Sequence, residues 1–378
     1  MTFSVSTNDS VTAKDPVRVI VVDDSAVIRG LISRAFIGLS DMKVVGSAAN
    51  GEMAVSTLKR TPADVVILDI EMPVMDGLTA IPLLKAVDAG VQIVMASTLT
   101  QKNAEISLKA MSLGATDYVP KPTTDQMSGS NAEDFNRELI EKTRALGALA
   151  RRRGVRPPTG LAEAPKVSLL SPKKPIVLRP LPLMFKPDVI AIGSSTGGPQ
   201  ALYELVKVLG NGLPQPIVMT QHMPAAFTKI LAEHIARQCG VDCKEGEDGD
   251  VLKPGKYYLA PGDNHMLLVR NGIDVVVKIT KDPPENFCRP AVDPMLRSLV
   301  PVYGKKILSV ILTGMGADGC KGSEAVVQAG GAVVAQDEAT SVVWGMPGAV
   351  AMAGVCSAVL PINQIGNAVR KLSAGGAL

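Results

Sequence analysis

Residues 188–209 read DVIAIGSSTGGPQALYELVKVL, and this stretch decides the fold of the second half of the chain. A short β-branched run leads into a glycine-rich turn, and the turn leads into a segment whose apolar residues are three and four positions apart. That pattern predicts a strand, a tight turn and a helix. The alternation recurs downstream, with strands expected at 216–221, 306–313 and 331–337 and helices at 225–238, from about 320, and at 362–373. Alternating strands and helices predict an α/β domain with a parallel sheet.

One block interrupts this alternation. The segments PGKYYLAPG (254–262), HMLLVRN (265–271) and DVVVKIT (274–280) alternate apolar and polar residues, and a helix is expected near 293–303. Period-two alternation is typical of half-buried strands. We therefore expect an antiparallel hairpin insertion here.

The first part of the chain contains five further strand–helix repeats. The strands are expected at 17–23, 43–49, 64–69, 91–97 and 116–120. Right-handed crossovers would place helices on both faces of a parallel sheet. We predict a flavodoxin-like (βα)5 domain with strand order 2-1-3-4-5, so the chain contains two doubly wound α/β domains.

A basic, proline-rich stretch separates the two domains. Residues 123–187 hold twelve Lys or Arg and six Asp or Glu, a net charge of +6. A charged helix is expected over 131–153, and the prolines that follow favour an extended spacer. We predict a first domain over 16–123, a linker over 124–187 and a second domain over 188–378. The arginine run at 151–153 leaves open a nucleic-acid-binding role, although such runs are more often solvated.

Composition excludes several classes of protein. No stretch approaches the ~20 apolar residues that cross a bilayer, and the first fifteen residues lack the apolar core of a signal peptide. We therefore predict a cytoplasmic protein without membrane insertion. The five cysteines are scattered, and Cys239 and Cys243 lack a neighbouring Cys/His pair for a zinc site, so reduced thiols are expected.

Acidic residues follow two strands of the first domain. Asp23 and Asp24 end the first strand and Asp69 ends the third, while Ser97 and Lys121 follow the fourth and fifth. In the predicted strand order these ends meet in one crevice. Hard oxygen ligands at a hydrated site suit Mg²⁺, and a carboxylate beside Mg²⁺ and a lysine is arranged to accept a phosphoryl group. The simpler alternative is that these acids cap helices.

A candidate nucleophile lies in the turn of the opening segment. Gly193-x-Ser195-x-Gly197 fits the nucleophile-elbow pattern, although a serine before a helix is often an N-cap. His222 ends the next strand and is the candidate base, with His265 as its competitor. Asp318 follows the strand over 306–313 and is the candidate orienting acid, and Asp293 is the weaker choice.

A second motif allows a different function. Gly314-x-Gly316-x-x-Gly319 follows a strand and precedes a helix, and Asp337 ends the next strand. This spacing satisfies the dinucleotide-binding fingerprint and would predict a dinucleotide-binding oxidoreductase that the first domain gates. Against it, Asp318 would carry a carboxylate into the pyrophosphate cradle.

The first domain resembles the receiver domain of two-component response regulators. The resemblance rests on VDDS (22–25), LDIEMPVMDG (68–77), MAST (95–98) and YVPKP (118–122). It implies Asp69 as the phosphoacceptor of a phosphoprotein, Asp23, Asp24 and Asp69 as Mg²⁺ ligands, Ser97 as the switch hydroxyl and Lys121 as the phosphate partner. It also implies a cis Lys121–Pro122 bond.

The second domain resembles the chemotaxis protein-glutamate methylesterases. The resemblance rests on IGSSTGGPQAL (192–202), TQHMPAAFT (220–228), EDGDVLKPGKYYLAPGDNHM (247–266), RPAVDPML (289–296) and ILTGMGADGCKG (311–322). It implies a hydrolase with Ser195 as nucleophile, His222 as base and Asp318 as orienting acid, with Met315 at the oxyanion hole and Thr196 beside the nucleophile. Methyl-accepting chemoreceptors would be its substrates, a histidine kinase its phosphodonor, and glutamine deamidation a second activity. No nucleic-acid partner is expected.

Overall fold

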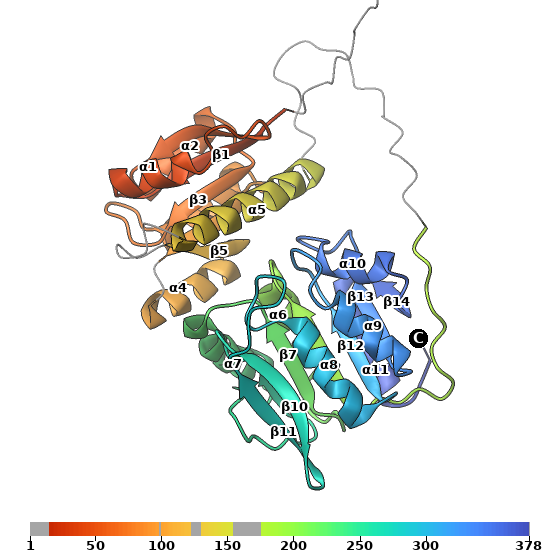
Figure 1. Cartoon of the computed structure of the whole chain (residues 1–378). Helices are drawn as coiled ribbons and strands as arrows, with labels where there is room; N and C mark the ends of the chain where they lie inside the picture. Colours follow the sequence, from red (N-terminus) through yellow and green to blue (C-terminus); the bar gives the residue numbers. More distant parts are fainter. Residues whose placement is uncertain (1–14, 98–99, 122–129, 154–174, 378) are drawn as a thin grey trace, which may run out of the picture.

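The computed structural model of the protein describes residues 15–97, 100–121, 130–153 and 175–377. Figure 1 shows two α/β domains, with the N-terminal one in red to yellow and the C-terminal one in green to blue. Within the described residues, none of the helices has both the length and the apolarity needed to cross a membrane. The predicted cis Lys121–Pro122 bond lies outside the described residues.

The N-terminal domain contains a five-stranded parallel sheet in the order β2-β1-β3-β4-β5, which confirms the predicted topology. Its strands are β1 (Val17–Val22), β2 (Met42–Ala48), β3 (Val65–Asp69), β4 (Gln92–Ser97) and β5 (Asp117–Pro120). Its helices are α1 (Ala26–Arg34), α2 (Gly51–Arg60), α3 (Gly77–Val87), α4 (Gln101–Ser112) and α5 (Ser130–Arg153).

Alternate residues of each strand enter two separate apolar layers. Val19 and Val21 of β1 pack with residues of α1 and α5, whereas Ile20 and Val22 pack with residues of α2, α3 and α4. Because successive side chains of a strand point to opposite faces, the sheet is buried on both sides. This burial explains the continuous apolar runs in the sequence.

The charged helix that we expected in the linker packs on this first sheet. Phe135, Leu139 and Leu146 of α5 are buried against β1 and its neighbours. Arg151 near the end of α5 forms an ion pair with Asp64, with 3.1 Å between Nη2 and Oδ2. The helix is therefore a layer of the N-terminal domain, and part of the arginine run is occupied by intramolecular contacts.

The C-terminal domain contains a seven-stranded sheet in the order β14-β13-β12-β6-β7-β9-β8, in which every pairing is parallel. Its strands are β6 (Val189–Ser194), β7 (Ile217–Gln221), β8 (Cys243–Glu245), β9 (Tyr257–Leu259), β12 (Ile307–Ile311), β13 (Ala332–Gln336) and β14 (Ala358–Leu360). Residues of α6 (Gly198–Leu209), α7 (Ala225–Cys239) and α11 (Ile362–Ser373) cover one face. The other face is covered by α8 (Val292–Tyr303), α9 (Cys320–Gln328), α10 (Met346–Met352) and the antiparallel pair β10 (His265–Asn271) and β11 (Asp274–Thr280).

The predicted hairpin block is correct for two of its three segments. β10 and β11 are antiparallel, but Tyr257–Leu259 forms β9, which pairs in parallel with β7 and β8. The expectation was wrong for β9 because its three residues are all buried, so they belong to a sheet covered on both faces. Alternation over so short a run does not distinguish the two cases.

The two domains are in direct contact. Helix α4 packs against α7, and the ring of Tyr118 on β5 stacks on the ring of Phe227 on α7, with centroids 4.3 Å apart and planes 12° apart. Gln200 on α6 donates a hydrogen bond to the carbonyl of Ala115, at 3.3 Å. An ion pair joins Arg152 to Glu338, with 3.1 Å between Nη1 and Oε1. These contacts place α5 close to the carboxyl edge of the sheet in the C-terminal domain (Figure 1).

Candidate functional site

The turn between β6 and α6 presents a single accessible hydroxyl. Ser194 and Thr196 are buried, whereas Ser195 is half-buried. The N-cap of α6 is Gly197, with φ of 74° and no side-chain capping bond, so Ser195 does not act as the cap. A side chain at position 197 would meet Val342 at 2.6 Å, which explains why glycine stands there. The turn therefore holds Ser195 before a helix N-terminus, where the free N–H groups favour negative charge.

His222 and Asp318 are in contact. The Nε2 atom of His222 lies 2.7 Å from the Oδ2 atom of Asp318. The Asp318 carboxylate also accepts backbone N–H bonds from Val292 at 2.6 Å and Asp293 at 3.0 Å, and Asn286 donates to it at 2.9 Å. Together these donors hold the Asp318 carboxylate in one orientation toward the His222 imidazole.

The electrostatics of these groups are set by burial and by their partners. Burial favours the neutral form of Asp318, but the His222 imidazole and the backbone donors outweigh it and lower the pKa of Asp318. Burial instead dominates at Asp293 and raises its pKa, with the charge of Asp318 acting in the same direction. Burial disfavours the charged form of His222, yet Cys288 and Asp318 together raise the pKa of His222. The pKa of Asp318 is thus lowered while that of the neighbouring Asp293 is raised, and such opposite shifts are typical of active sites.

Ser195 and His222 line one cavity with a volume of about 560 Å³. Met315 lines the same cavity, and the hydroxyl of Thr196 is buried without a hydrogen-bond partner among the described residues. The Nδ1 atom of His222 lies 3.4 Å from the Sγ atom of Cys288. In this structure the sulfur, and not the Ser195 hydroxyl, is the partner of that nitrogen within the described part of the chain.

The N-terminal domain contributes one side of this cavity. Its lining includes Tyr118 and four residues of α5, namely Arg137, Glu138, Glu141 and Lys142. The guanidinium carbon of Arg137 lies 4.7 Å from the ring centroid of Phe287, which is next to Asn286 in a loop of the C-terminal domain. The first domain therefore lies directly over the candidate site.

The competing candidates are accounted for elsewhere. The Nδ1 atom of His265 accepts a hydrogen bond from the N–H of Ala291 at 3.2 Å, and its Nε2 lies 3.1 Å from the carbonyl oxygen of Pro283, so both ring nitrogens serve the loop between them. Asp293 accepts from the N–H of Gly322 at 2.6 Å and contacts Asn286, not an imidazole. His265 and Asp293 thus support the site from outside it.

The glycine loop of the dinucleotide fingerprint holds Asp318 in place. The Asp318 carboxylate is directed at His222, where a pyrophosphate cradle would need free N–H groups. Asp337, which would bind a ribose, instead accepts from the N–H of Thr340 at 3.0 Å and from its hydroxyl at 2.6 Å. The oxidoreductase alternative is not supported.

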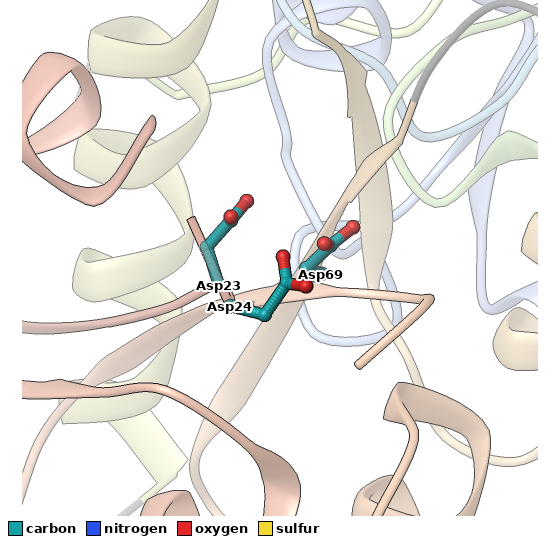
Figure 2. A group of neighbouring side chains, drawn as sticks. All are labelled: Asp23, Asp24 and Asp69. Carbon is teal, nitrogen blue, oxygen red and sulfur yellow. The ribbon is translucent and has the colours of Figure 1, made fainter. Parts of the chain in front are cut away.

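A second candidate site lies at the carboxyl edge of the first sheet. Oxygen atoms of Asp23, Asp24 and Asp69 all lie within 4.8 Å of one another, and Figure 2 shows the three side chains together. The Nζ atom of Lys121 contacts Asp23 at 2.5 Å and Asp69 at 2.7 Å. Burial raises the pKa of Asp69, and Lys121 opposes that shift. Three carboxylates carry more charge than Lys121 balances, and their hard oxygens fit a divalent cation such as Mg²⁺.

The predicted switch hydroxyl has a partner on α4. The Ser97 hydroxyl lies 3.2 Å from that of Ser107 on α4, and both residues are buried. Ser97 thus contacts the helix that packs against the C-terminal domain. Its role as a switch stays a prediction.

Sequence reasoning missed several residues at the site. Tyr118, Gln221, Asn286 and Cys288 were not singled out, although Gln221 is adjacent to His222 in the TQHMP motif. That adjacency is the signal that would have found Gln221. The loop that carries Asn286 and Cys288 gives no comparable signal, because its path back to His222 depends on the tertiary fold.

Fold and site together define a class of protein, a response-regulator receiver joined to an α/β hydrolytic domain. The family model described as a response regulator receiver domain matches residues 19–128, and the one described as CheB methylesterase matches residues 190–369.

Relatives extend this match to nearly the whole chain. A protein-glutamate methylesterase/protein-glutamine glutaminase of group 2 operon from Rhodospirillum centenum is 59% identical over 95% of this chain and 95% of its own. The protein-glutamate methylesterase/protein-glutamine glutaminase of Azospirillum brasilense is 57% identical over 96% of this chain and 94% of its own. The chain belongs to the family of protein-glutamate methylesterases/protein-glutamine glutaminases. A crystal structure of the Thermotoga maritima CheB methylesterase catalytic domain is 42% identical, covering 50% of this chain and 98% of that one, with a TM-score of 0.48.

Proposed function

We propose that this chain hydrolyses glutamate methyl esters on chemoreceptors, and deamidates receptor glutamines, under the control of receiver phosphorylation. The enzyme class, a carboxylic ester hydrolase with glutaminase activity, is that of its family. The observation that carries the assignment of residues is the contact between His222 and Asp318 on the cavity that Ser195 lines.

In the proposed reaction the Ser195 oxygen attacks the ester carbonyl carbon while its proton passes to His222. Because Asp318 holds the Nε2 side of the ring, the receiving atom is Nδ1. The same proton is then given to the departing methoxide, and methanol leaves an acyl-enzyme. Water repeats the sequence and releases the glutamate side chain. With a glutamine substrate the leaving group is ammonia.

Negative charge develops on the carbonyl oxygen during both steps. Backbone N–H groups at the start of α6 and that of Met315 are the proposed donors. Thr196 lies beside them, and its buried hydroxyl has no hydrogen-bond partner in the part of the chain that the structure describes. In other hydrolases the removal of one such donor costs about 3 kcal/mol of transition-state stabilisation.

The receiver is proposed to gate this reaction. Asp69 would accept a phosphoryl group from a histidine kinase of a two-component system, and Mg²⁺ held by Asp23, Asp24 and Asp69 would neutralise charge on that group. Two observations support a path from Asp69 to the interface. Ser97 contacts Ser107 on α4, which packs on α7, and Lys121 is three residues from the stacked Tyr118. Phosphorylation would weaken this docked arrangement and open the cavity.

The partners and setting belong to the same proposal. The substrates are methyl-accepting chemoreceptors, the setting is chemotaxis in the cytoplasm, and no nucleic-acid partner is proposed. Arg151 and Arg152 support this last point, since they pair with Asp64 and Glu338.

The test measures the release of methanol from membranes that contain methylated chemoreceptor, with and without a phosphodonor. We expect wild type to respond to a small-molecule phosphodonor with Mg²⁺, Asp69→Asn to show only the basal rate, and Ser195→Ala to show no release in either condition. A Ser195→Ala protein with the wild-type rate would disprove the assigned nucleophile. A full response of Asp69→Asn would disprove the gate while leaving the esterase assignment intact.

A further inference from the structure

The nitrogen of His222 that must receive the serine proton has another partner in this structure. Its Nδ1 atom lies 3.4 Å from the Cys288 sulfur, while Nε2 is held by Asp318. A thiol at this distance is within hydrogen-bonding range for sulfur and competes with the Ser195 hydroxyl for one lone pair. Cys288 lies in the C-terminal domain, but its position depends on a loop that also contacts the receiver.

That loop is a tight turn with an unusual residue at its tip. Glu285 and Cys288 exchange backbone hydrogen bonds of 3.1 and 2.8 Å, and both residues between them have positive φ, 52° for Asn286 and 63° for Phe287. Positive φ at both central positions is the pattern of a type I′ turn, in which the second position favours glycine. A bulky aromatic residue in this conformation is rare and points to a functional constraint.

Phe287 is the residue of the turn that contacts the receiver. Its side chain is 83% exposed, and the guanidinium of Arg137 on α5 lies 4.7 Å from its ring centroid. A cation over an exposed ring is a weak attraction. The contact is therefore weak, and a small movement of α5 would break it.

The ends of the loop are fixed, while its middle contacts both His222 and Asp318. The two ring nitrogens of His265 bond the backbone at Pro283 and Ala291, on either side of the turn. Inside it, Asn286 donates to Asp318 at 2.9 Å, and Cys288 contacts His222. One turn thus contacts the Asp318 carboxylate on the Nε2 side of the His222 ring and places the Cys288 sulfur on the Nδ1 side.

We propose that Cys288 is a positioning residue that keeps Nδ1 of His222 from Ser195 while the receiver is docked, and that Arg137 holds it there through Phe287. The inference rests on the proposed function and deepens it. The docked receiver then restrains the base directly, in addition to covering the cavity. Release of Phe287 lets the turn relax, the sulfur withdraw and the Ser195 hydroxyl take its place.

The experiment uses the full-length chain and methanol release, with and without phosphodonor. We expect Cys288→Ala to raise kcat of the unphosphorylated protein about fivefold, the factor given by loss of one hydrogen bond of ordinary strength, with KM unchanged. The phosphorylated rate should change less than about twofold. Cys288→Ser keeps a hydroxyl donor and should stay close to wild type. Cys320→Ala, which removes another half-buried thiol on α9, is the matched control and should leave both rates unchanged.

Two further readouts separate positioning from a general loosening of the fold. The ¹⁵N resonance of His222 Nδ1 should shift in Cys288→Ala and not in Cys320→Ala. Arg137→Met should raise the unphosphorylated rate in the wild-type background and add nothing to Cys288→Ala, because both changes act on one contact. Additive effects would overturn the link from Arg137 to Cys288.

The outcomes distinguish this inference from the proposed function. If Ser195→Ala is inactive but Cys288→Ala has an unchanged or lower unphosphorylated rate, the role of Cys288 is disproved and the hydrolase assignment stands. If Ser195→Ala keeps the wild-type rate, the nucleophile assignment fails first, whatever Cys288→Ala does.

Discussion

At the scale of single residues, Gln221 joins the two halves of the candidate catalytic machinery. Its Oε1 accepts a hydrogen bond from the Ser194 hydroxyl at 2.7 Å, and its Nε2 donates to the carbonyls of Ser195 at 3.0 Å and His222 at 3.2 Å. The side chain is 2% exposed. One amide therefore fixes the nucleophile turn relative to the strand that carries the base.

We predict that Gln221→Met, which keeps the volume but removes these bonds, lowers kcat at least tenfold. A misplacement of reacting groups by an ångström is enough for such a loss. The chain offers a close control in Gln215, which is equally buried, accepts from Ser373 and donates to the carbonyls of Pro187 and Ser373 far from the cavity. Gln215→Met should lower the melting temperature and leave kcat unchanged. Equal kcat losses in the two variants would contradict a positioning role for Gln221.

The pH dependence of the reaction follows from the raised pKa of His222. A base must be neutral, so the rate of the unphosphorylated protein should rise with pH through a pKa above the ordinary 6.5. Asp318 contributes to that shift through its hydrogen bond and its charge, and Asp318→Asn should move the rising limb to lower pH. The same shift stabilises the folded chain below pH 6.5, and the contribution is lost as pH rises through the folded pKa. Profiles of kcat/KM between about pH 6 and 10 test this, and superimposable limbs would refute it.

Sequence alone placed the acids and the candidate triad at strand ends, because the carboxyl ends of parallel strands share one edge. The contact between His222 and Asp318 agrees with that reasoning, and their catalytic roles remain to be measured. The contact of Cys288 with His222 could not be predicted from the sequence. The two residues are 66 positions apart, and a turn with two positive φ values places the sulfur beside the ring.

At the scale of elements, α5 offers a test of packing against helix propensity. Gly147 in α5 faces β1, and an added Cβ would overlap the Val17 side chain, whose own Cβ would lie 3.1 Å away. Gly30 in α1 has no atom within 4 Å of such a Cβ among the described residues. Alanine in place of glycine adds about 1 kcal/mol of helix propensity, whereas overpacking costs about 1–3 kcal/mol.

We therefore expect opposite signs for the same substitution. Gly30→Ala should stabilise the receiver by about 0.5–1 kcal/mol, and Gly147→Ala should destabilise it by about 1 kcal/mol, because overlap with the buried Val17 exceeds the gain in propensity. Scanning calorimetry of the full-length variants measures both shifts. A common direction would mean that α5 is not packed on β1 as closely as described.

The elements themselves were predictable where the pattern was long. The five strands of the first sheet and the predicted helices of the second domain follow the expected ranges, because buried β-branched runs and amphipathic helices differ in length and period. β8 and β14 were missed, since three residues carry no period. The partner of β9 was wrong, because alternation does not encode the direction of pairing.

At the scale of the whole molecule, docking between the domains rests on apolar contact. A continuous apolar cluster runs from α2, α3 and α4 to α6 and α7, and the Tyr118–Phe227 stack lies within it. The interdomain ion pair of Arg152 and Glu338 is largely exposed, so it contributes little. The sequence did not predict this interface. An apolar helix face that packs within its own domain has the same residue pattern as one that packs against a second domain.

Tyr118 is the residue whose truncation should test the docked state most directly. Its ring stacks on the Phe227 ring, and the Lys142 ammonium lies 5.0 Å from its centroid. Tyr118→Ala removes the stack and its buried area, a loss of about 2–3 kcal/mol from the docked form. At 1.4 kcal/mol per factor of ten, the undocked fraction rises by one to two orders of magnitude. We expect the unphosphorylated rate to rise at least tenfold toward the phosphorylated one. Tyr118→Phe keeps the ring and should change neither rate. If the two variants have equal rates, the stack does not hold the receiver over the cavity.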